Sequence, residues 1–507
     1  MDSLERDAFE VLKLVQSMKN SFAPINRIPP EVLSLIPDYY CEGAVDRAPT
    51  ALTHVCRSWR EIFTSRSSLW TTLEFTNIDK TRAYIQRSRS SPLDLHLVGD
   101  EVIDDAFALV IPHICRLKSL TVRSVALPRV LEHFHRHTPL LEKLDIDVWP
   151  TDDPVLDVWP VDNPVLDGAL FSGDLSSLRE LRLHGDITDL SWKNLANLRS
   201  IDIRSYSYGY GTTQLLDFFE SAPLLHTALL RCTTLDPPNH PSERVVPLRH
   251  LKVFSLSTGS PNSILLRHLH IPVGASLISQ FILRGEPSRF LSDLAERYPN
   301  FDNLSHITTI HLLLAPDQKF IQLRGPSGSF CVLAWREESG LLPSYATDHE
   351  ILCSLDNLML STIRRLAISD YEHQRPAGAE QCPISQTLSF ATNLRTLVIT
   401  DCNNLPFILA LDPQQNPSNI VLCPNLEGLV LYVVSLDQLH VEHLISMAKN
   451  RASRGAKLSS ITFIDLHGLV PEKEVLELGE YVTHVEYRGD DNDEQPYWYD
   501  IPDWREG

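Results

Sequence analysis

Short apolar triplets recur along most of this 507-residue chain. Each has the form Leu-x-x-Leu-x-Leu or a close variant, and its last two apolar positions alternate with other residues, as in a strand with one buried face. The regular copies are Leu117-Leu120-Val122, Leu141-Leu144-Ile146, Leu178-Leu181-Leu183, Leu198-Ile201-Ile203, Leu251-Phe254-Leu256, Ile307-Ile310-Leu312, Ile363-Leu366-Ile368, Leu394-Leu397-Ile399, Leu426-Leu429-Leu431 and Leu458-Ile461-Phe463. Weaker copies are Leu225-Ala228-Leu230 and Ile278-Phe281-Leu283, and Val482-Val485-Tyr487 is taken as a terminal copy.

The spacing of the copies predicts a repeat architecture. The last regular copies begin at residues 363, 394, 426 and 458, which are 31, 32 and 32 residues apart. Recurrence at such a period is typical of folds in which each strand and its return segment form one layer. The alternative is an ordinary α/β domain of alternating strands and helices. Both interpretations place the chain in the α/β class.

Residues 1–24 have the pattern of an amphipathic helix. Its apolar positions are Leu4, Ala8, Val11, Leu12, Val15 and Met18. We expect this helix to pack against the segment that follows it. A short dimerising helix is the alternative, although the stripe is too brief to argue for a coiled coil from sequence.

Residues 25–75 predict two helices with more apolar positions than one buried stripe needs. Pro29 and Pro30 suit a first helical turn, Glu31 suits the positive end of the helix dipole, and Pro37 is expected to end the helix. In the second helical stretch the apolar positions are Leu52, Val55, Cys56, Trp59, Ile62 and Phe63. A module of about 45 residues is too small to bury all of them, so some should face a partner or the next domain. The alternative is two core helices of a larger α domain.

This segment resembles an F-box, the helical module that docks substrate receptors onto cullin–RING ubiquitin ligases. Three motifs occur in the family's order: Pro29-Pro30-Glu31-Val32-Leu33, Val55-Cys56-Arg57-Ser58-Trp59-Arg60 and Ser68-Leu69-Trp70. The resemblance implies binding to a Skp-family adaptor, and through it to a cullin, by Ile28, Pro29, Pro30, Leu33, Ile36, Val55, Cys56, Trp59 and Trp70. Pro37, where the family usually has Phe, and the long connection from Ile36 to Leu52 depart from the pattern and predict a shortened first helix.

The repeats resemble leucine-rich repeats. The copy Leu394-x-x-Leu397-x-Ile399-x-x-Cys402-x-x-Leu405 is similar to the cysteine-containing repeats often joined to F-boxes. Residues 76–488 are therefore expected to form an irregular solenoid with parallel strands on the concave face and helices or loops outside. Target binding is expected at concave-face residues; the candidates are Arg182, His184, Asp202, Arg204 and Tyr432. A plain solvated sheet surface is the alternative for each of them.

Together the two resemblances imply a substrate-recognition subunit of an SCF-type ubiquitin ligase, of the F-box and leucine-rich-repeat kind abundant in fungi. The alternative is a non-catalytic interaction scaffold whose F-box recruits no ligase. Loop insertions are expected at 147–167, a near-duplicated Pro-containing segment, and at 316–345, within which 319–336 predict a β-hairpin. Residues 489–507 form an acidic, aromatic tail.

Composition narrows the partners. The net charge of −20 and pI near 5.4 argue against general binding to nucleic acid or anionic membranes. The nine cysteines include no Cys-x-x-Cys pair, which fits a reducing compartment. The chain has no apolar signal segment and no apolar run of the roughly 18 to 20 residues needed to span a membrane. Cytoplasm or nucleus is therefore expected.

Enzyme motifs are sparse. The sequence has no nucleophile elbow, His-Glu-x-x-His motif, Rossmann fingerprint or P-loop, so no catalytic residue and no cofactor are expected. His133, His135 and His137 would share one face of a strand, but they lack a carboxylate at metal spacing, so no metal site is expected. A metal- or ligand-dependent enzyme on the repeat domain remains the rival from another class.

Overall fold

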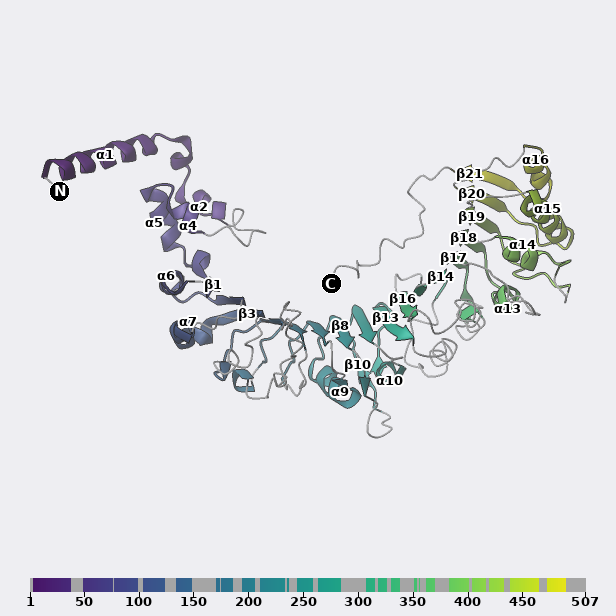
Figure 1. Cartoon of the computed structure of the whole chain (residues 1–507), viewed down its shortest axis with the longest axis horizontal. Helices are drawn as coiled ribbons and strands as arrows, with labels where there is room; N and C mark the ends of the chain where they lie inside the picture. Colours follow the sequence, from purple (N-terminus) through teal and green to yellow (C-terminus); the bar gives the residue numbers. More distant parts are fainter. Residues whose placement is uncertain are drawn as a thin grey trace, which may run out of the picture. The chain divides into compact units, whose positions relative to one another are not determined.

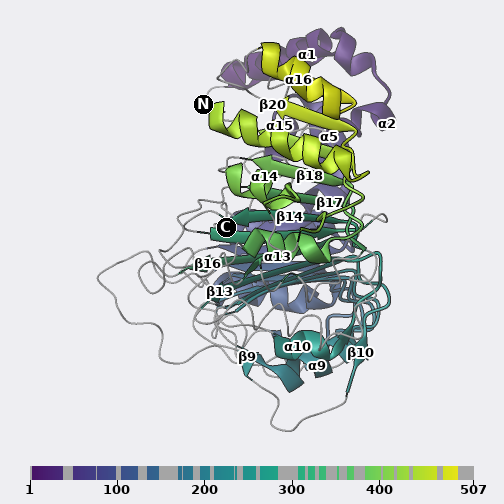
Figure 2. The ribbon, with the colours of Figure 1, turned by 90° about the vertical axis from the view of Figure 1, so that its right-hand side faces the viewer.

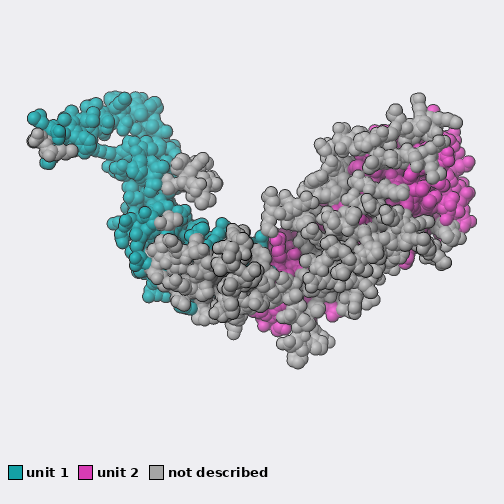
Figure 3. Space-filling model, viewed as in Figure 1, with its two compact units in different colours: residues 1–206 teal, residues 207–507 magenta. Residues whose placement is uncertain are grey.

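The protein divides into two compact units, residues 1–206 and residues 207–507 (Figure 3). The computed structural model describes residues 3–37, 49–75, 77–98, 104–123, 134–147, 170–173, 175–185, 194–205, 210–232, 235–236, 244–258, 263–283, 307–314, 318–325, 330–337, 351–352, 355, 362–369, 383–400, 404–415, 419–432, 438–464 and 472–488. The loop insertion predicted at 147–167, apart from Asp147, lies outside the described residues, as does the tail at 489–507.

The first unit opens with short helices. They are α1 (Ser3–Ser21), η1 (Pro24–Arg27), α2 (Pro30–Leu33), α4 (Thr50–Thr53), α5 (Arg57–Ser65) and η2 (Ser67–Trp70) (Figure 1). The predicted N-terminal helix is confirmed as α1. Its expected packing against the segment that follows is wrong, because the apolar side chains of α1 remain more than half exposed, from 54% at Leu12 to 82% at Leu4.

The predicted helix boundaries after α1 need two corrections. Pro29 and Pro30 do start α2, but the helix ends at Leu33, four residues before Pro37, and Ile36 and Pro37 are again helical. Pro37 is tolerated in the helical stretch that begins at Ile36 because the first turn of a helix needs no N–H donor. The second stretch forms two helices, α4 and α5, because Cys56 has extended backbone angles (φ −157°, ψ 176°) between them.

The sheet of the first unit is parallel and follows chain order. Its strands are β1 (Thr72–Glu74), β2 (Leu93–Val98), β3 (Leu117–Arg123), β4 (Lys143–Asp147), β5 (Glu180–His184) and β6 (Ser200–Arg204), each parallel to the next. Between them lie α6 (Ile78–Ser88), which the Asn77 side chain caps by accepting from the Lys80 N–H, α7 (Asp104–Val110), η3 (Ile111–Arg116) and η5 (Leu170–Gly173). The predicted strands of β3 to β6 are confirmed, whereas β1, β2 and α6 were not predicted.

One row of side chains forms the core of this sheet. Paired along the strands, in order, are Leu73, Leu95, Leu120, Leu144, Leu181 and Ile201. None is more than 2% exposed. Burying each such side chain contributes roughly 1.5–3 kcal/mol relative to leaving it in water. The periodic leucines therefore stack into one continuous apolar layer.

The second unit has a larger sheet. Its strands, in spatial order, are β8 (Thr227–Cys232), β11 (Val253–Thr258), β13 (Ser276–Leu283), β16 (Phe330–Glu337), β15 (Gln318–Arg324), β14 (Thr309–Leu314), β17 (Arg365–Ser369), β18 (Thr396–Thr400), β19 (Gly428–Tyr432), β20 (Ser460–Ile464) and β21 (His484–Arg488). Neighbours are parallel except that β15 is antiparallel to both β14 and β16. Two short parallel pairs, β7 (Tyr210–Gly211) with β9 (Leu235–Asp236) and β10 (Val246–Pro247) with β12 (Leu269–His270), lie apart from this sheet.

Helices cover one face of its C-terminal strands. Figures 1 and 2 show α13 (Pro383–Phe390), α14 (Leu405–Leu411), α15 (Gln438–Ser453) and α16 (Glu472–Tyr481) along the same side of β17 to β21. Nearer the N-terminus of this unit lie α9 (Thr212–Ser221) and α10 (Ser263–Arg267). Strand, helix and the next parallel strand thus alternate along the end of the chain, which defines a mixed α/β fold.

Two sequence predictions in this unit met different outcomes. The hairpin at 319–336 is confirmed as β15 and β16, but these strands lie within the sheet, so the described part of 316–345 is not a loop. The copy at Ile278-Phe281-Leu283 forms a strand in a different register from the predicted one. Leu277 pairs with Phe254 and is 4% exposed, so it holds the core position assigned to Phe281.

A buried arginine holds the C-terminal helices in place. Arg451 of α15 is 0% exposed, and its guanidinium donates to the carbonyls of Leu422 (2.7 Å) and Cys423 (2.9 Å), just before β19. We expect Arg451→Met to lower the free energy of unfolding by about 2–4 kcal/mol, because the buried Leu422 carbonyl loses its guanidinium donor and the Cys423 carbonyl keeps only the Leu426 N–H. Urea unfolding followed by circular dichroism would measure this, with the exposed Arg395→Met as the control. A loss of unfolding free energy no larger than that of the control would contradict the stabilising role of Arg451.

Candidate functional site

A compact apolar cluster holds the short helices of residues 25–70 together. Its buried members are Leu33 of α2, Leu52 of α4, and Trp59 and Phe63 of α5. Around them pack the partly buried Ile28, Ile36, Cys56, Ile62 and Leu69. The rings of Trp59 and Phe63 meet edge to face at 5.4 Å, a favourable aromatic geometry. We call residues 24–70 the helical module.

Hydrogen bonds fix both tryptophans of the module. The Trp59 indole N–H donates to the Asn26 side-chain oxygen at 2.8 Å, which ties α5 to η1. The Trp70 indole N–H donates to the Phe63 carbonyl at 3.0 Å. The Trp70 ring also packs edge to face on Tyr84 of α6 and lies under the guanidinium of Arg87. Trp70 therefore joins the module to the first helix of the sheet region.

The structure separates the nine predicted adaptor-binding residues into three groups. Buried are Leu33, Trp59 and Trp70; partly buried are Ile28, Ile36 and Cys56; exposed are Pro29, Pro30 and Val55. Two further apolar side chains, Val32 and Leu35, are 50% and 52% exposed and were missed as surface residues. The signal for them was the excess of apolar positions around Leu33. The module thus carries uncovered apolar side chains on α2, in the turn that follows it and next to α4.

Five charged side chains and one histidine gather on three neighbouring strands of the first unit. They are Asp145 and Asp147 of β4, Arg182 and His184 of β5, and Asp202 and Arg204 of β6, here named the β4–β6 charge cluster. The strand register aligns them in two rows, Asp145–Arg182–Asp202 and Asp147–His184–Arg204. Since residues two apart on a strand share a face, all six lie on the same side of the sheet.

Ion pairs link the members of the cluster. Arg182 stands between two carboxylates, 3.5 Å from Asp145 and 3.5 Å from Asp202. Asp202 is also 3.2 Å from His184 Nε2 and 3.3 Å from Arg204 Nε. His184 Nδ1 lies 3.9 Å from Asp147. Asp202 is therefore the carboxylate on which one histidine and two arginines converge.

Electrostatics keep that central carboxylate ionised. Burial by itself would raise the pKa of Asp202, but the adjacent His184 ring and the charge of Arg204 outweigh it and lower the pKa below its usual value. The aspartates are nearly buried, whereas the Arg182 side chain is 48% exposed and that of Arg204 28%. The cluster therefore presents guanidinium donors backed by carboxylates, which suits carboxylate or carbonyl acceptors on a partner.

The fifth predicted target-binding residue belongs to the other unit. Tyr432 ends β19, is partly buried and pairs in register with Ile464 of β20. Four of the five candidates, Arg182, His184, Asp202 and Arg204, are thus brought together in the first unit, and Tyr432 lies in the second unit. The sequence pattern places Asp145 and Asp147 at the same repeat positions as that group, and therefore on the same strand face, but it does not predict the ion pairs.

A buried histidine in the second unit predicts acid sensitivity. Burial first, then Arg324 and Arg365, lowers the pKa of His311 on β14 to about 4 from its ordinary 6.5. Because the folded protein resists protonation of this ring, stability is intact above pH 6.5 and falls as pH drops toward 4; at pH 5 the loss is about 2 kcal/mol. His311→Asn should remove this part of the difference in urea-unfolding free energy between pH 7 and pH 5. An unchanged pH difference would contradict this.

Candidate metal ligands are scarce in the described part of the chain. Within it, no three His, Cys, Asp or Glu side chains are arranged to hold a metal ion. His135 and His137 are exposed and lie in a segment that is not a strand, so the shared strand face that a metal site would need is absent for these two; His133 lies outside the described residues. Among the helices described, none combines the length and apolarity needed to cross a bilayer.

Comparisons with known proteins found no match, so a function for this chain has to be argued from the surfaces described above. No protein-family model matches the chain, and no curated protein matches it.

Proposed function

We propose that this chain is a substrate-recognition subunit of an SCF-type cullin–RING ubiquitin ligase. The helical module acts as an F-box that binds a Skp-family adaptor and through it a cullin. The parallel sheet acts as an irregular leucine-rich-repeat solenoid that binds a target protein. The observation that carries the proposal is the apolar surface of the module, which leaves Pro29, Pro30, Val32, Leu35 and Val55 exposed around a well-packed cluster.

Burial divides the residues of the module into those that stabilise it and those that could contact a partner. Leu33, Trp59 and Phe63 stabilise it from inside, so their part in adaptor binding is to hold the helices. The exposed side chains supply the contact area, and Ile28, Ile36 and Cys56 line its margin. An apolar surface on a module this small is what an obligate partner would cover.

The β4–β6 charge cluster is the proposed target contact on the first unit. Arg182, which is exposed, and Arg204, which is partly buried, offer donors held in place by Asp145 and Asp202. Preorganised guanidinium groups lose little conformational freedom when they bind an acceptor. Tyr432 would provide an aromatic contact on the second unit. An acidic or carbonyl-rich segment of the target fits the cluster.

Catalysis in this proposal belongs to the partner enzymes. The receptor holds a target lysine near the ubiquitin thioester of the conjugating enzyme, which raises the effective concentration of the reacting groups. The chain needs no catalytic residue, metal or cofactor for that role. It would act in the cytoplasm or nucleus, where the ligase components reside.

An interaction scaffold is the second candidate. It is favoured by the length of α2, which is a single turn, Pro30–Leu33, and offers a small apolar surface. A scaffold would bind the adaptor without a cullin, or would not bind it.

Reconstitution separates the two candidates. The full chain is mixed with Skp-family adaptor, cullin–RING core, ubiquitin-activating enzyme, conjugating enzyme, ubiquitin and ATP, and transfer to the chain's own lysines is followed. A receptor predicts adaptor-dependent transfer, because its lysines are held close to the thioester. Adaptor binding without any transfer would favour the scaffold, and a folded chain that binds no adaptor would overturn the ligase assignment.

A further inference from the structure

Helix α1 carries a continuous apolar seam that no described part of the chain covers. Along it and the turn that follows, the apolar side chains Leu4, Ala8, Val11, Val15, Met18 and Phe22 are spaced alternately by four and three residues. This is the spacing of the a and d positions of a coiled coil, with Leu4, Val11 and Met18 at d and Ala8, Val15 and Phe22 at a. All six are exposed. For the five larger side chains, all except Ala8, the exposed fraction runs from 55% at Val15 to 82% at Leu4.

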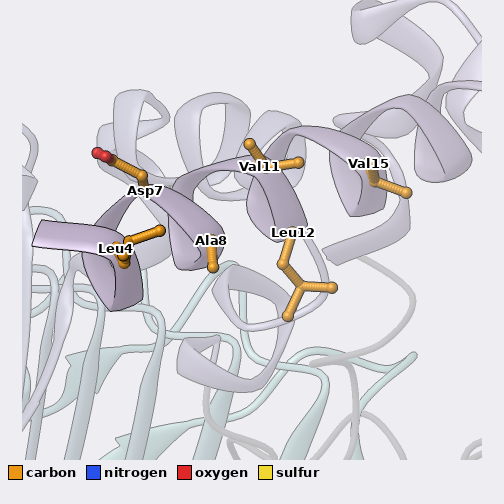
Figure 4. A pocket seen from close by; sticks show the side chains of 6 residues that line it. All are labelled: Leu4, Asp7, Ala8, Val11, Leu12 and Val15. Atoms are coloured by element: carbon orange, nitrogen blue, oxygen red, sulfur yellow. The ribbon is translucent and has the colours of Figure 1, made fainter.

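A shallow, open groove lies on this seam. Its volume is about 480 Å³, and it is lined by Leu4, Asp7, Ala8, Val11, Leu12 and Val15, all from α1 (Figure 4). The small Ala8 leaves the space between its larger neighbours. In knobs-into-holes packing such a hole receives one apolar side chain of the facing helix. The groove therefore points to a helical occupant.

Charge is divided along α1 in a way that selects the occupant. The N-terminal half carries Glu5, Arg6, Asp7 and Glu10, a net charge of −2, and the C-terminal half carries Lys13 and Lys19, a net charge of +2. Glu5 and Lys19 both fall at e positions, beside the seam. In an antiparallel pair of identical helices, each acidic end meets a basic end; in a parallel pair, like charges meet.

We propose that α1 pairs with α1 of a second copy of this chain as a short antiparallel coiled coil. With Leu4 against the partner's Phe22, Ala8 faces the partner's Met18 and Val11 faces the partner's Val15. The same register sets Glu5 beside the partner's Lys19 and brings Leu12 against the partner's Leu12. One register therefore pairs the apolar side chains with each other and the acidic side chains with basic ones. In it, the two copies of α1 cover each other's seam.

The interaction is expected to be weak and reversible. A 19-residue helix is about 28 Å long and offers three layers of distinct contacts, so the dissociation constant should be on the order of micromolar. This interface uses none of the exposed residues of the helical module. The dimer proposal can therefore be tested independently of adaptor binding.

Sedimentation velocity of the full chain between about 1 and 100 µM tests the proposal. The wild-type chain should pass from monomer to dimer over this range. Val11→Glu with Val15→Glu should raise the dissociation constant by roughly a hundredfold or more, because the carboxylates enter an apolar layer. Phe9→Glu is the matched control: Phe9 is an exposed apolar residue of the same helix that lies off the seam, at a b position. A wild-type chain that stays monomeric, or a double variant that dimerises like the control, would overturn the proposal.

Charge exchange tests the orientation of the pair. Glu5→Lys alone and Lys19→Glu alone should each weaken the dimer several-fold, because each places like charges side by side. The two changes together should restore it, since the antiparallel pairs are re-formed with reversed sign. Additive weakening in the double variant would exclude the antiparallel arrangement. Pull-down of a different protein by α1, with no self-association, would also contradict the proposal.

Discussion

Glutamate at both Val32 and Val55 is expected to abolish binding of a Skp-family adaptor by the full chain. Both side chains are at least half exposed, so the change leaves the buried cluster of Leu33, Trp59 and Phe63 intact. Each carboxylate would enter an apolar interface without a partner, at a cost of several kcal/mol. The adaptor dissociation constant should therefore rise by at least about a hundredfold, as measured by isothermal titration calorimetry.

Val98→Glu is the matched control for this experiment. Val98 is 71% exposed at the end of β2, in the same unit but outside the helical module. The control should bind the adaptor as the wild-type chain does. Equal binding by the double variant would remove the exposed apolar side chains from the proposed contact, and circular dichroism of both variants checks that the fold is intact.

Trp59→Ala is expected to unfold the helical module while the sheets remain folded. The side chain is 7% exposed, packs on Phe63 and donates to Asn26, so truncation removes packing, an aromatic contact and the tie to η1. Losses of about 3–5 kcal/mol are typical of such changes, and a module this small has little stability to spare. Hydrogen exchange should show lost protection in α5 with the amides of β17 to β20 unchanged.

Trp59→Phe is a milder change at the same site. It keeps an aromatic ring against Phe63 but removes the indole donor and part of the buried ring volume, so the loss should be about 1–2 kcal/mol and the module should stay folded. Protection in α5 that survives Trp59→Ala would contradict the role assigned to the cluster. It follows that substitutions at Trp59 report on stability, whereas those at Val32 and Val55 report on adaptor contact.

The strands were predictable because the side chains that define them repeat. Leu120, Leu144, Leu181 and Ile201 stack in register, and each was identified from its triplet. The pattern missed β2, whose Leu93, Leu95 and Leu97 alternate without the preceding leucine, and β1, which has three residues. It also misplaced the core position of β13, because an apolar run of alternating residues fits more than one register.

The interaction surfaces were less predictable. Periodicity shows that a residue is apolar, but in a small module it cannot tell Leu33, which is buried, from Val32 and Leu35, which are exposed. For the same reason the sequence could not decide whether the apolar stripe of α1 packs on the next segment or stays uncovered, since burial depends on contacts distant in sequence. The charge cluster needed the strand register, because Asp145, Arg182 and Asp202 are 37 and 20 residues apart in sequence and adjacent in the sheet.

The central claim is that the helical module recruits a ligase adaptor. The most direct measurement is the affinity and stoichiometry of the complex between the purified full chain and a Skp-family adaptor. The account predicts a stable complex with one adaptor per chain, lost in the Val32→Glu, Val55→Glu variant and retained in Val98→Glu. A folded wild-type chain that shows no binding to the adaptor would contradict it.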